Sequence, residues 1–286
     1  MTDAGERRRA RQVTAAPAKL NLFLHVLRRR ADGYHDLQTL FQLVDLCDTV
    51  HVVATDDGSI ARDPPPTDPV LAALDPDADL TVRAAKLLKD ASGTPLGAHL
   101  YIEKRIPSGG GLGGGSSDAA TVLLALNQRW NLNWPRERLA ELGLQLGADV
   151  PLFVLGRTAW GEGRGERLTP VALPSRWFLI VHPRVSVSTA LVFQAPELTR
   201  DTPAITLDEY LHNGGHNDCE PVVRRRHPEV AAALDWLSGH APALLTGTGS
   251  CIFAAFATEA DARRVAQLAP SRWSCFIARG LDRSPD

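Results

Sequence analysis

Hydrophobic and polar positions recur along the chain with two periods, which predict strands and helices in mixed order. Alternation, or a short apolar run bounded by turn residues, indicates a strand, whereas recurrence at helical spacing indicates an amphipathic helix. We expect strands at residues 14–26, 45–53, 99–106, 177–182, 251–256 and 273–278, and a hairpin at 158–171. We expect helices at residues 80–91, 119–130, 135–146, 230–237 and 259–269. The alternation of strand and helix in the C-terminal half suggests a ferredoxin-like domain there.

Polar residues interrupt the first expected strand. Lys19 and Asn21 stand in an apolar stretch and are expected to share one face with Phe23. They are either the solvent-facing side of an edge strand or two polar groups that point into a cleft.

Three further residues have ambiguous local patterns. Tyr34 and His35 follow an Asp-Gly turn, and their residue types alone suit a half-buried aromatic and a surface histidine. Asp149 precedes an apolar run, where it is either a helix cap or turn residue or a functional carboxylate.

The strongest chemical signal is the segment 107–118, PSGGGLGGGSSD. Six of the seven positions from 109 to 115 are glycine, and the segment joins an expected strand to an expected helix. Ser116, Ser117 and Asp118 are residue types that cap helix N-termini. Free backbone N–H groups and the positive helix end bind anions, so the segment predicts a phosphate site. The alternative is a flexible linker, which the entropic cost of ordering so many glycines argues against.

Three known glycine loops fit this segment poorly. A Walker loop ends in Gly-Lys-Ser/Thr, but Ser116 follows Gly115 with no lysine. Gly109, Gly111 and Gly114 match the dinucleotide fingerprint in spacing, but no acidic residue closes a second strand about twenty residues later. A protein-kinase loop requires His-Arg-Asp and Asp-Phe-Gly motifs, which the sequence lacks.

Composition narrows the class of protein. The 286 residues suit one large domain or two smaller ones, and 44% hydrophobic with 22% charged residues is ordinary for a soluble globular protein. The net charge of −2 gives no support to nucleic-acid binding, and no apolar run approaches the roughly 18 residues of a membrane span. Four scattered cysteines predict reduced cytosolic thiols and neither a zinc site nor a disulfide framework.

Two segments are expected to lack regular structure. Arg7, Arg8, Arg9 and Arg11 form a basic tail that we expect to be a solvated arm. Residues 56–79 are rich in Asp and Pro and are expected to be irregular.

The glycine segment resembles the P-x-x-x-G-L-G-S-S-x-A signature of the GHMP small-molecule kinases, which include galactokinase and the homoserine, mevalonate and phosphomevalonate kinases. Residues 17–24 (PAKLNLFL) and 247–250 (GTGS) resemble the first and third motifs of that family. Residues 30–39, with the pattern R-x-D-G-Y-H-x-L-x-T, resemble the cytidyl-binding segment of one member, and residues 146–153 (LGADVPLF) match a further family segment. The resemblance runs from about residue 14 to about residue 280, with the motifs in the family's order.

Two further segments bear on the resemblance, one that matches the family and one that departs from it. Asn217-Asp218-Cys219-Glu220 also matches the family, but no function is predicted for it. Asp79 stands where the family usually has asparagine near the adenosine, which is a departure from the pattern.

The resemblance implies roles for individual residues. Lys19 and Asp149 are expected to be catalytic, with Asp149 beside the substrate hydroxyl. The expected ATP-binding residues are Lys104, Pro107, Gly109, Gly110, Gly111, Leu112, Gly113, Gly114, Gly115, Ser116 and Ser117. The expected substrate-binding residues are Asn21, Tyr34, His35, Asp149, Thr189, Phe193, Gly247 and Thr248, with Tyr34 and Phe193 stacked on a cytosine and His35 hydrogen-bonded to its edge. No metal-binding side chain is expected.

The resemblance also implies a fold and an activity. The implied fold is the α+β, two-domain GHMP kinase fold. It has a ribosomal-protein-S5-domain-2-like ATP domain at 14–172, a ferredoxin-like domain at 173–283 and the active site in the cleft between them. The activity is phosphorylation by ATP, with Mg²⁺, of a hydroxyl on a small cytidine-diphosphate substrate in the non-mevalonate route to isoprenoid precursors. We expect a cytoplasmic monomer or weak homodimer with no nucleic-acid or membrane partner.

Two other classes of function stay open at this stage. Another GHMP kinase would act on a sugar, homoserine or mevalonate, and the Tyr34-His35 pair argues against it. A non-catalytic ligand-binding relative is argued against by the presence of both Lys19 and Asp149.

Overall fold

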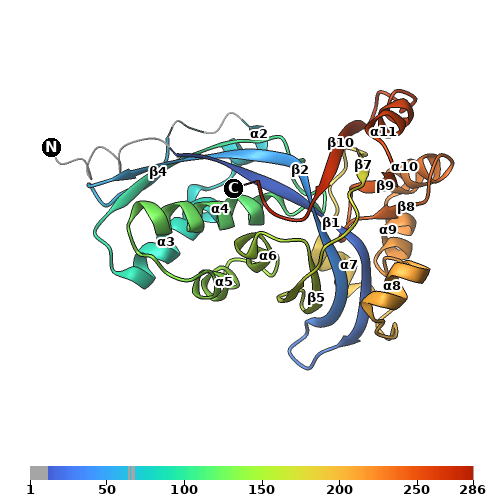
Figure 1. Ribbon diagram of the computed structural model, residues 1–286, viewed down its shortest axis with the longest axis horizontal. Coiled ribbons are helices and arrows are strands. Elements are labelled where there is room, and N and C mark those ends of the chain that lie inside the picture. Colours follow the sequence, from blue (N-terminus) through green and yellow to red (C-terminus); the bar gives the residue numbers. More distant parts are fainter. Residues whose placement is uncertain (1–11, 64, 66–67, 286) are drawn as a thin grey trace.

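The computed structural model describes residues 12–63, 65 and 68–285 of the chain. The predicted basic tail (Arg7, Arg8, Arg9 and Arg11) lies outside the described residues, as do Pro64 and Pro66 of the proline-rich stretch. The molecule is elongated, and its two halves are joined by two long strands (Figure 1).

These two strands are β1 (Gln12–Arg29) and β2 (His35–Thr55), which pair antiparallel along most of their length. The expected Asp-Gly turn joins them, and Gly33 has a φ of 86°, a conformation that glycine adopts at little cost. The register shifts after Pro17 and again between Asn21 and Leu24. Such bulges increase local twist and change which residues face a given side.

Each stretch of β2 pairs with a different strand and so extends the sheet. Residues 37–41 pair with β5, residues 43–44 with β10, and residues 49–55 with β4. The order along the sheet is β3-β4-β2-β10-β7-β9-β8, and β1, β5 and β6 attach beside this path. The remaining strands are β3 (Ile60–Arg62), β4 (Gly97–Glu103), β5 (Ala159–Gly163), β6 (Arg167–Pro170), β7 (Trp177–His182), β8 (Ala243–Leu245), β9 (Ile252–Phe256) and β10 (Ser274–Leu281).

In the N-terminal half, four helices cover one face of the sheet (Figure 1). They are α3 (Leu80–Ser92), α4 (Gly114–Arg129), α5 (Arg136–Gly143) and α6 (Val150–Leu155). Leu88, Leu123 and Leu126 are completely buried between these helices and the strands. Helix α4 is the centre of this core because most of its residues are buried.

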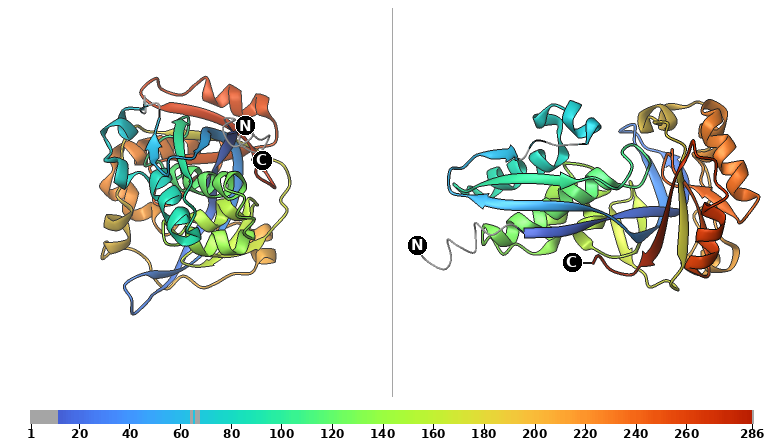
Figure 2. Two further views of the ribbon diagram at one scale, coloured as in Figure 1. Left: turned by 90° about the vertical axis from the view of Figure 1, so that its left-hand side faces the viewer. Right: turned by 90° about the horizontal axis from the view of Figure 1, so that it is seen from above.

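In the C-terminal half, five helices lie around β7, β8, β9 and β10, at the opposite end from α3 and α5 (Figures 1 and 2). They are α7 (Thr189–Gln194), α8 (Leu207–Asn213), α9 (Glu220–Arg226), α10 (Pro228–Ser238) and α11 (Glu259–Ala266). A second core contains Leu179, Val223 and Leu234, and it also takes in Leu24 and Val26 from β1.

A third hydrophobic cluster connects the two halves. It joins Leu20 of β1 and Leu112 of the glycine segment to Ile180 and Phe253 of the C-terminal strands. The glycine segment is therefore fixed by packing from both halves.

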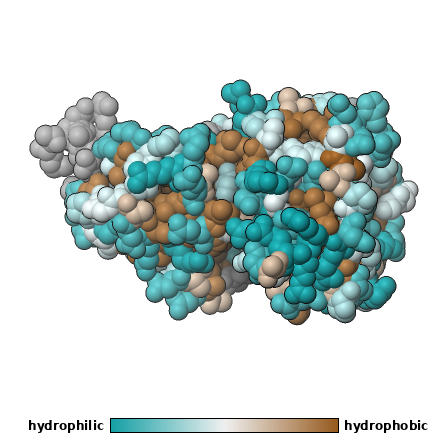
Figure 3. All heavy atoms as spheres, turned by 90° about the horizontal axis from the view of Figure 1, so that it is seen from below, coloured by the Kyte–Doolittle hydropathy of each residue, from teal (hydrophilic) through white to brown (hydrophobic). Residues whose placement is uncertain are grey.

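The surface of the molecule is mostly hydrophilic on the face that Figure 3 shows. On the face shown in Figure 3, hydrophobic residues gather in small groups among hydrophilic ones, over both halves of the molecule. In the part of the chain that the structure describes, no helix is both long and apolar enough to cross a membrane.

The prediction of mixed helices and strands is confirmed, but one boundary is wrong in an instructive way. Helix α4 begins at Gly114, so Ser116, Ser117 and Asp118 lie within the helix and do not cap it. Gly113 is the N-cap, with a φ of 73°. The last two glycines of the run therefore contribute helical N–H groups, which local propensity did not indicate.

Other differences concern loops. The stretch expected to be irregular contains β3 and two short helical segments, α2 (Pro69–Ala73) and η1 (Pro76–Ala78). Helices α6, α8 and α9 were not predicted.

Candidate active site

Two cavities meet at the glycine segment, between the two halves of the molecule. We call them the Lys19 cavity, whose wall includes Lys19, Thr39, Asp149 and Phe193, and the glycine-loop cavity, which runs along residues 107–116 to the start of α3. Gly111, Gly113, Ser116 and Thr189 line both cavities.

Nearly all the predicted ATP-binding residues line the glycine-loop cavity. These are Lys104, Pro107, Gly109, Gly110, Gly111, Leu112, Gly113, Gly114, Gly115 and Ser116. Ser117 does not line it, because it is completely buried in α4. The first turn of α4 points N–H groups that have no intrahelical partner at this cavity, which makes it suited to an anion.

The glycine segment is held in place by close approach of the third predicted motif. Gly110 accepts a hydrogen bond from the Cys251 backbone N–H at 3.0 Å. A Cβ on Gly111 would lie 2.3 Å from the Thr246 carbonyl oxygen, so only glycine fits there. The expected proximity of residues 247–250 to the glycine segment is thus found in the structure.

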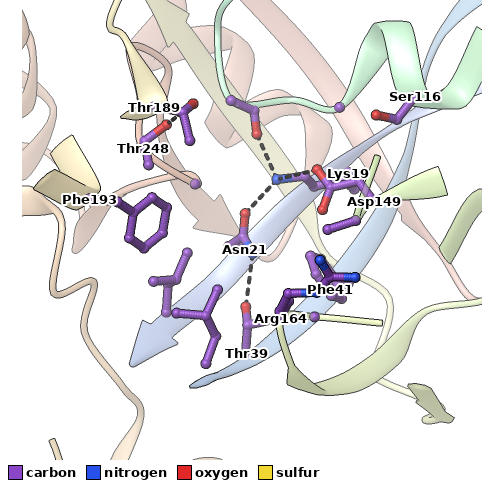
Figure 4. Close-up of a pocket in the computed structure, with 17 residues that line it drawn as sticks. Lys19, Asn21, Thr39, Phe41, Ser116, Asp149, Arg164, Thr189, Phe193 and Thr248 are labelled. Carbon is purple, nitrogen blue, oxygen red and sulfur yellow. Dashed lines mark hydrogen bonds and ion pairs between the residues drawn. The ribbon is translucent and has the colours of Figure 1, made fainter. Parts of the chain in front are cut away.

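Lys19 is at the centre of the other cavity (Figure 4). Its Nζ donates to Asn21 Oδ1 at 2.6 Å and to the Gly111 carbonyl oxygen at 2.8 Å. Asp149 Oδ2 lies 3.8 Å away, which makes an ion pair but is too long for a hydrogen bond. The Lys19 side chain is 4% exposed and that of Asp149 is 34% exposed, so the carboxylate is the member of the pair open to a ligand.

The electrostatics of this pair follow from burial. Burial lowers the pKa of Lys19, and the Asp149 carboxylate opposes that shift. Asp149 occupies the N-cap position of α6 but makes no side-chain capping bond there, so its carboxylate is free to face Lys19.

The wall beside Lys19 comes from β1 and β2. Asn21 Nδ2 donates to Thr39 Oγ1 at 2.9 Å, which fixes the amide so that its oxygen faces Lys19. Beyond Asn21 the register shift turns Leu24 toward the cavity, while Phe23 is buried against Trp160 and Tyr210. The expectation that Phe23 shares the polar face is wrong for this reason.

Asn217 and Asp218, for which no function was predicted, hold neighbouring parts of the site in place. Asn217 Nδ2 donates to the carbonyl oxygens of Leu245 and Gly247 at 2.7 and 2.8 Å, so it holds the third motif. Asp218 accepts from the Val26 backbone N–H at 2.6 Å and so fastens β1 to the C-terminal half.

Lys104 belongs to a buried ionic cluster at the edge of the glycine-loop cavity. Its Nζ donates to Asp48 and, at 2.8 Å, to Asp118. Asp48 also accepts from the backbone N–H groups of Arg105 and Ile106 at 2.6 and 2.8 Å. Burial raises the pKa of Asp118 to about 7, and its Oδ1 has no hydrogen-bond partner among the described residues. Burial acts to lower the pKa of Lys104, but the two carboxylates raise it above its usual value.

Four more of the predicted substrate-binding residues lie at the far side of the Lys19 cavity, whereas the predicted residue His35 is buried and does not line it. Phe193, Thr189, Gly247 and Thr248 line it, and the two threonine hydroxyls are 2.8 Å apart. The Phe193 and His35 rings are stacked, with centroids 5.2 Å apart.

Tyr34 does not line this cavity. It is 56% exposed, and the Arg164 guanidinium lies 4.9 Å from its ring centroid. Arg164 does line the cavity, so it connects Tyr34 to the site.

Several lining residues were missed by sequence reasoning. Leu37, Thr39 and Phe41 alternate along β2 and all face the cavity, so period-two alternation continuing from His35 would have found them. Arg164 lies in the turn between β5 and β6 and carries no such signal.

Asp79 has a local structural role. Its Oδ1 caps α3 by accepting from the Thr81 N–H at 2.8 Å, and its Oδ2 pairs with Arg62 at 3.5 Å. Arg62 also donates to the carbonyl oxygens of Leu71 and Leu74, two residues that line the glycine-loop cavity. The aspartate is therefore paired with a cation inside the chain.

Comparison with known proteins gives two family matches. Residues 79–157 match the GHMP kinases N terminal domain, and residues 199–274 match the GHMP kinases C terminal domain. A relative from Chromohalobacter salexigens, 4-diphosphocytidyl-2-C-methyl-D-erythritol kinase, is 55% identical over 276 residues, which are 94% of this chain and 91% of that protein.

The fold is also similar to solved structures of kinases. A crystal structure of 4-(cytidine 5'-diphospho)-2C-methyl-D-erythritol kinase has a TM-score of 0.80 and 35% identity, covering 94% of this chain and 99% of that one. The mevalonate kinase of Methanococcus jannaschii has a TM-score of 0.70 at 16% identity, covering 95% of this chain and 99% of that one, which shows a shared fold.

Proposed function

The chain belongs to the GHMP kinase family, and from this premise we propose that it transfers the γ-phosphoryl group of ATP to the 2-hydroxyl of 4-diphosphocytidyl-2-C-methyl-D-erythritol. This reaction serves the non-mevalonate route to isoprenoid precursors. The observation that carries the proposal is the position of Asp149 and Lys19 where a phosphate-binding cavity meets a second cavity lined by an aromatic ring and hydroxyl groups.

ATP occupies the glycine-loop cavity. The N–H groups of the first turn of α4 bind the phosphates, and the positive end of the helix favours their charge. Lys104 adds a cation at the edge of this cavity.

Mg²⁺ accompanies the nucleotide. Among the described residues, no group of three or more His, Cys, Asp or Glu side chains is arranged to hold a metal. The Asp118 Oδ1 atom is buried without a hydrogen-bond partner among the described residues, and both Asp118 and Ser116 line the cavity. Hydroxyl and carboxylate oxygens are suitable ligands, so these residues fit an ion that is held mainly by phosphates. When bound, the ion neutralises phosphate charge.

The chemistry of the transfer is mostly positioning and charge neutralisation. The acceptor hydroxyl oxygen attacks the γ-phosphorus, and the bond from that phosphorus to the ADP oxygen breaks. Asp149 orients the hydroxyl and accepts its proton, because its carboxylate is exposed to the cavity. Lys19 holds Asp149 in place and stabilises negative charge on the transferring group.

The cytidyl group lies toward Phe193 and His35, where stacking contributes ~1–3 kcal/mol per base. Asn21, Thr189, Gly247 and Thr248 contact the polar part of the substrate. Tyr34, with the Arg164 guanidinium over its ring, contacts the substrate from the rim of the cavity.

The division into domains at 14–172 and 173–283 is part of the same proposal. The first hydrophobic core draws its buried residues from 16–159, whereas the second draws them from 179–273 together with Leu24 and Val26.

A substrate panel tests the function. ADP release is measured with the cytidyl substrate, mevalonate, galactose and homoserine as acceptors, with Asp149→Asn protein as the control for contaminating kinases. We expect release only with the cytidyl substrate. Equal or faster release with another acceptor would show that a different GHMP activity is the correct one.

A further inference from the structure

Arg200 contacts both Phe193, which lines the Lys19 cavity, and His35, whose buried ring is stacked on that of Phe193. Its Nε donates to His35 Nε2 at 3.1 Å. Its Nη2 donates to the carbonyl oxygens of Phe193 and Ala195 at 2.9 and 2.6 Å, and its Nη1 donates to that of Leu198 at 2.9 Å. One guanidinium therefore fixes both the imidazole and the backbone that carries the Phe193 ring.

The contact with Arg200 decides which nitrogen of His35 carries the proton. A guanidinium has only donors and remains charged in proteins. Nε2 of His35 must therefore be the unprotonated acceptor, and in the neutral ring the proton is on Nδ1. Nδ1 makes no hydrogen bond to the described residues, and it is not among the fully buried side-chain atoms that lack a partner, so its N–H keeps some contact with the surroundings and can donate to a ligand.

The surroundings of His35 favour the neutral ring. Burial lowers the pKa of His35, and the charges of Arg200 and Arg29 lower it further. Arg29 is directly opposite His35 in the pairing of β1 with β2, and the Phe193 ring covers one face of the imidazole.

We propose that Arg200 is a positioning residue for base recognition, which holds His35 as the Nδ1–H tautomer and so presents one fixed donor to the pyrimidine. This inference rests on the proposed function, because it assigns the base to the side of the Lys19 cavity where Phe193 lies. Cytosine carries acceptors on its pairing edge, at the ring nitrogen and the carbonyl oxygen, and a fixed N–H donor matches either one. Stacking tolerates any base, so discrimination between bases depends on edge contacts of this kind, and a donor at the ring nitrogen would favour cytosine over uracil, whose ring nitrogen carries a proton.

A purely structural role for Arg200 makes different predictions. Arg226 is a matched control, because it also fastens the segment around α7, through the Leu191 carbonyl oxygen at 3.3 Å and Glu197 at 2.9 Å, but does not touch His35. If Arg200 only fastens this segment, Arg200→Met and Arg226→Met should have similar effects.

The kinetic test compares KM values for the two substrates. We expect Arg200→Met to raise the KM of the cytidyl substrate about tenfold, the effect of one misplaced hydrogen bond, and to leave the KM of ATP within about twofold. Arg226→Met should leave both nearly unchanged. In a His35→Ala background, Arg200→Met should add little, because its effect passes through the imidazole. Parallel increases in both KM values, or additive effects in the double variant, would overturn the proposal.

The spectroscopic test needs no substrate. Long-range ¹H–¹⁵N spectra report the tautomer of each of the nine histidines, and the His35 signals are assigned by their loss in His35→Ala. We expect Nδ1–H in the wild-type protein at pH 7.5 and a mixture of tautomers in Arg200→Met. An Nε2–H tautomer in the wild type would refute the inference even if the kinase activity is as proposed. Failure of the kinase proposal would leave the tautomer result standing.

Discussion

Replacing Lys19 and Asp149 separately should separate effects on stability from effects on catalysis. The two side chains differ in burial, so only the Lys19 variant should lose stability as well as turnover. Asp149→Asn changes a side chain that is one-third exposed and 3.8 Å from its partner. An ion pair of that kind contributes about 0–1 kcal/mol to stability, so the free energy of unfolding should hardly change. Turnover should fall by ~10²–10⁴-fold if the carboxylate accepts the proton.

Lys19→Met should affect both properties. It removes the Lys19 Nζ donor to the Gly111 carbonyl oxygen and to Asn21 Oδ1. The Gly111 oxygen keeps only a long contact from Thr246 Oγ1 at 3.5 Å among the described residues, and a buried acceptor left without a donor costs about 1–3 kcal/mol. Part of that cost is offset, because burying the ammonium group is itself unfavourable. We therefore expect a loss of stability near the lower end of this range, together with a large loss of turnover.

Two measurements test these effects in both single variants and in the double variant. They are single-turnover phosphoryl transfer and unfolding in urea. Asp90→Asn, an exposed change on α3 that lines neither cavity, is the control. The losses in transfer rate should be strongly non-additive, because the two residues act on one reacting centre. If Asp149→Asn transfers at a near-native rate, its role as base is wrong. If the two rate losses simply add, the pair does not act as a unit.

Three further outcomes are expected. Gly111→Ala should lose more than about 1 kcal/mol of stability in thermal unfolding, because the new Cβ meets the Thr246 carbonyl at 2.3 Å and φ is 77°, whereas Gly115→Ala, with its nearest contact at 3.4 Å, should fold normally. His25→Leu should stabilise the protein by about 1 kcal/mol at pH 7.5, because both ring nitrogens are buried without a partner among the described residues. Burial lowers the pKa of His25, so the wild type should lose more stability than His25→Leu as pH falls below about 6.5. The difference between the two proteins in urea unfolding should therefore widen at pH 5.5, and a narrowing difference would contradict the assignment. Phe193→Ala should weaken binding of the cytidyl substrate by ~1–3 kcal/mol in calorimetry and leave ATP affinity nearly unchanged. Equal weakening of the binding of both ligands would indicate a structural role for the ring.

Local sequence patterns were sufficient for many individual elements of this protein, although not for the short helices α6, α8 and α9. The helical spacing at residues 80–91 and the apolar run at 177–182 predicted α3 and β7 closely, because burial of one face or of a whole strand imposes a periodicity that can be read directly. The glycine segment similarly predicted an anion site, because few other functions explain so many glycines before a helix.

Tertiary structure decided which side chains meet. Lys104 and Asp48 are 56 positions apart, and Arg200 and His35 are 165 apart, yet each pair is in direct contact. No local sequence pattern indicates either contact. The first depends on the pairing of β2 with β4, and the second on the packing of β2 against the segment that follows α7. Even the start of α4 at Gly114 depended on packing, because Gly114 lies against Ile106 and Lys104 where its own helix propensity is poor. The sequence by itself determined the elements and the chemical character of the site, whereas pairing register and burial, which act between distant residues, determined which donor faces which acceptor.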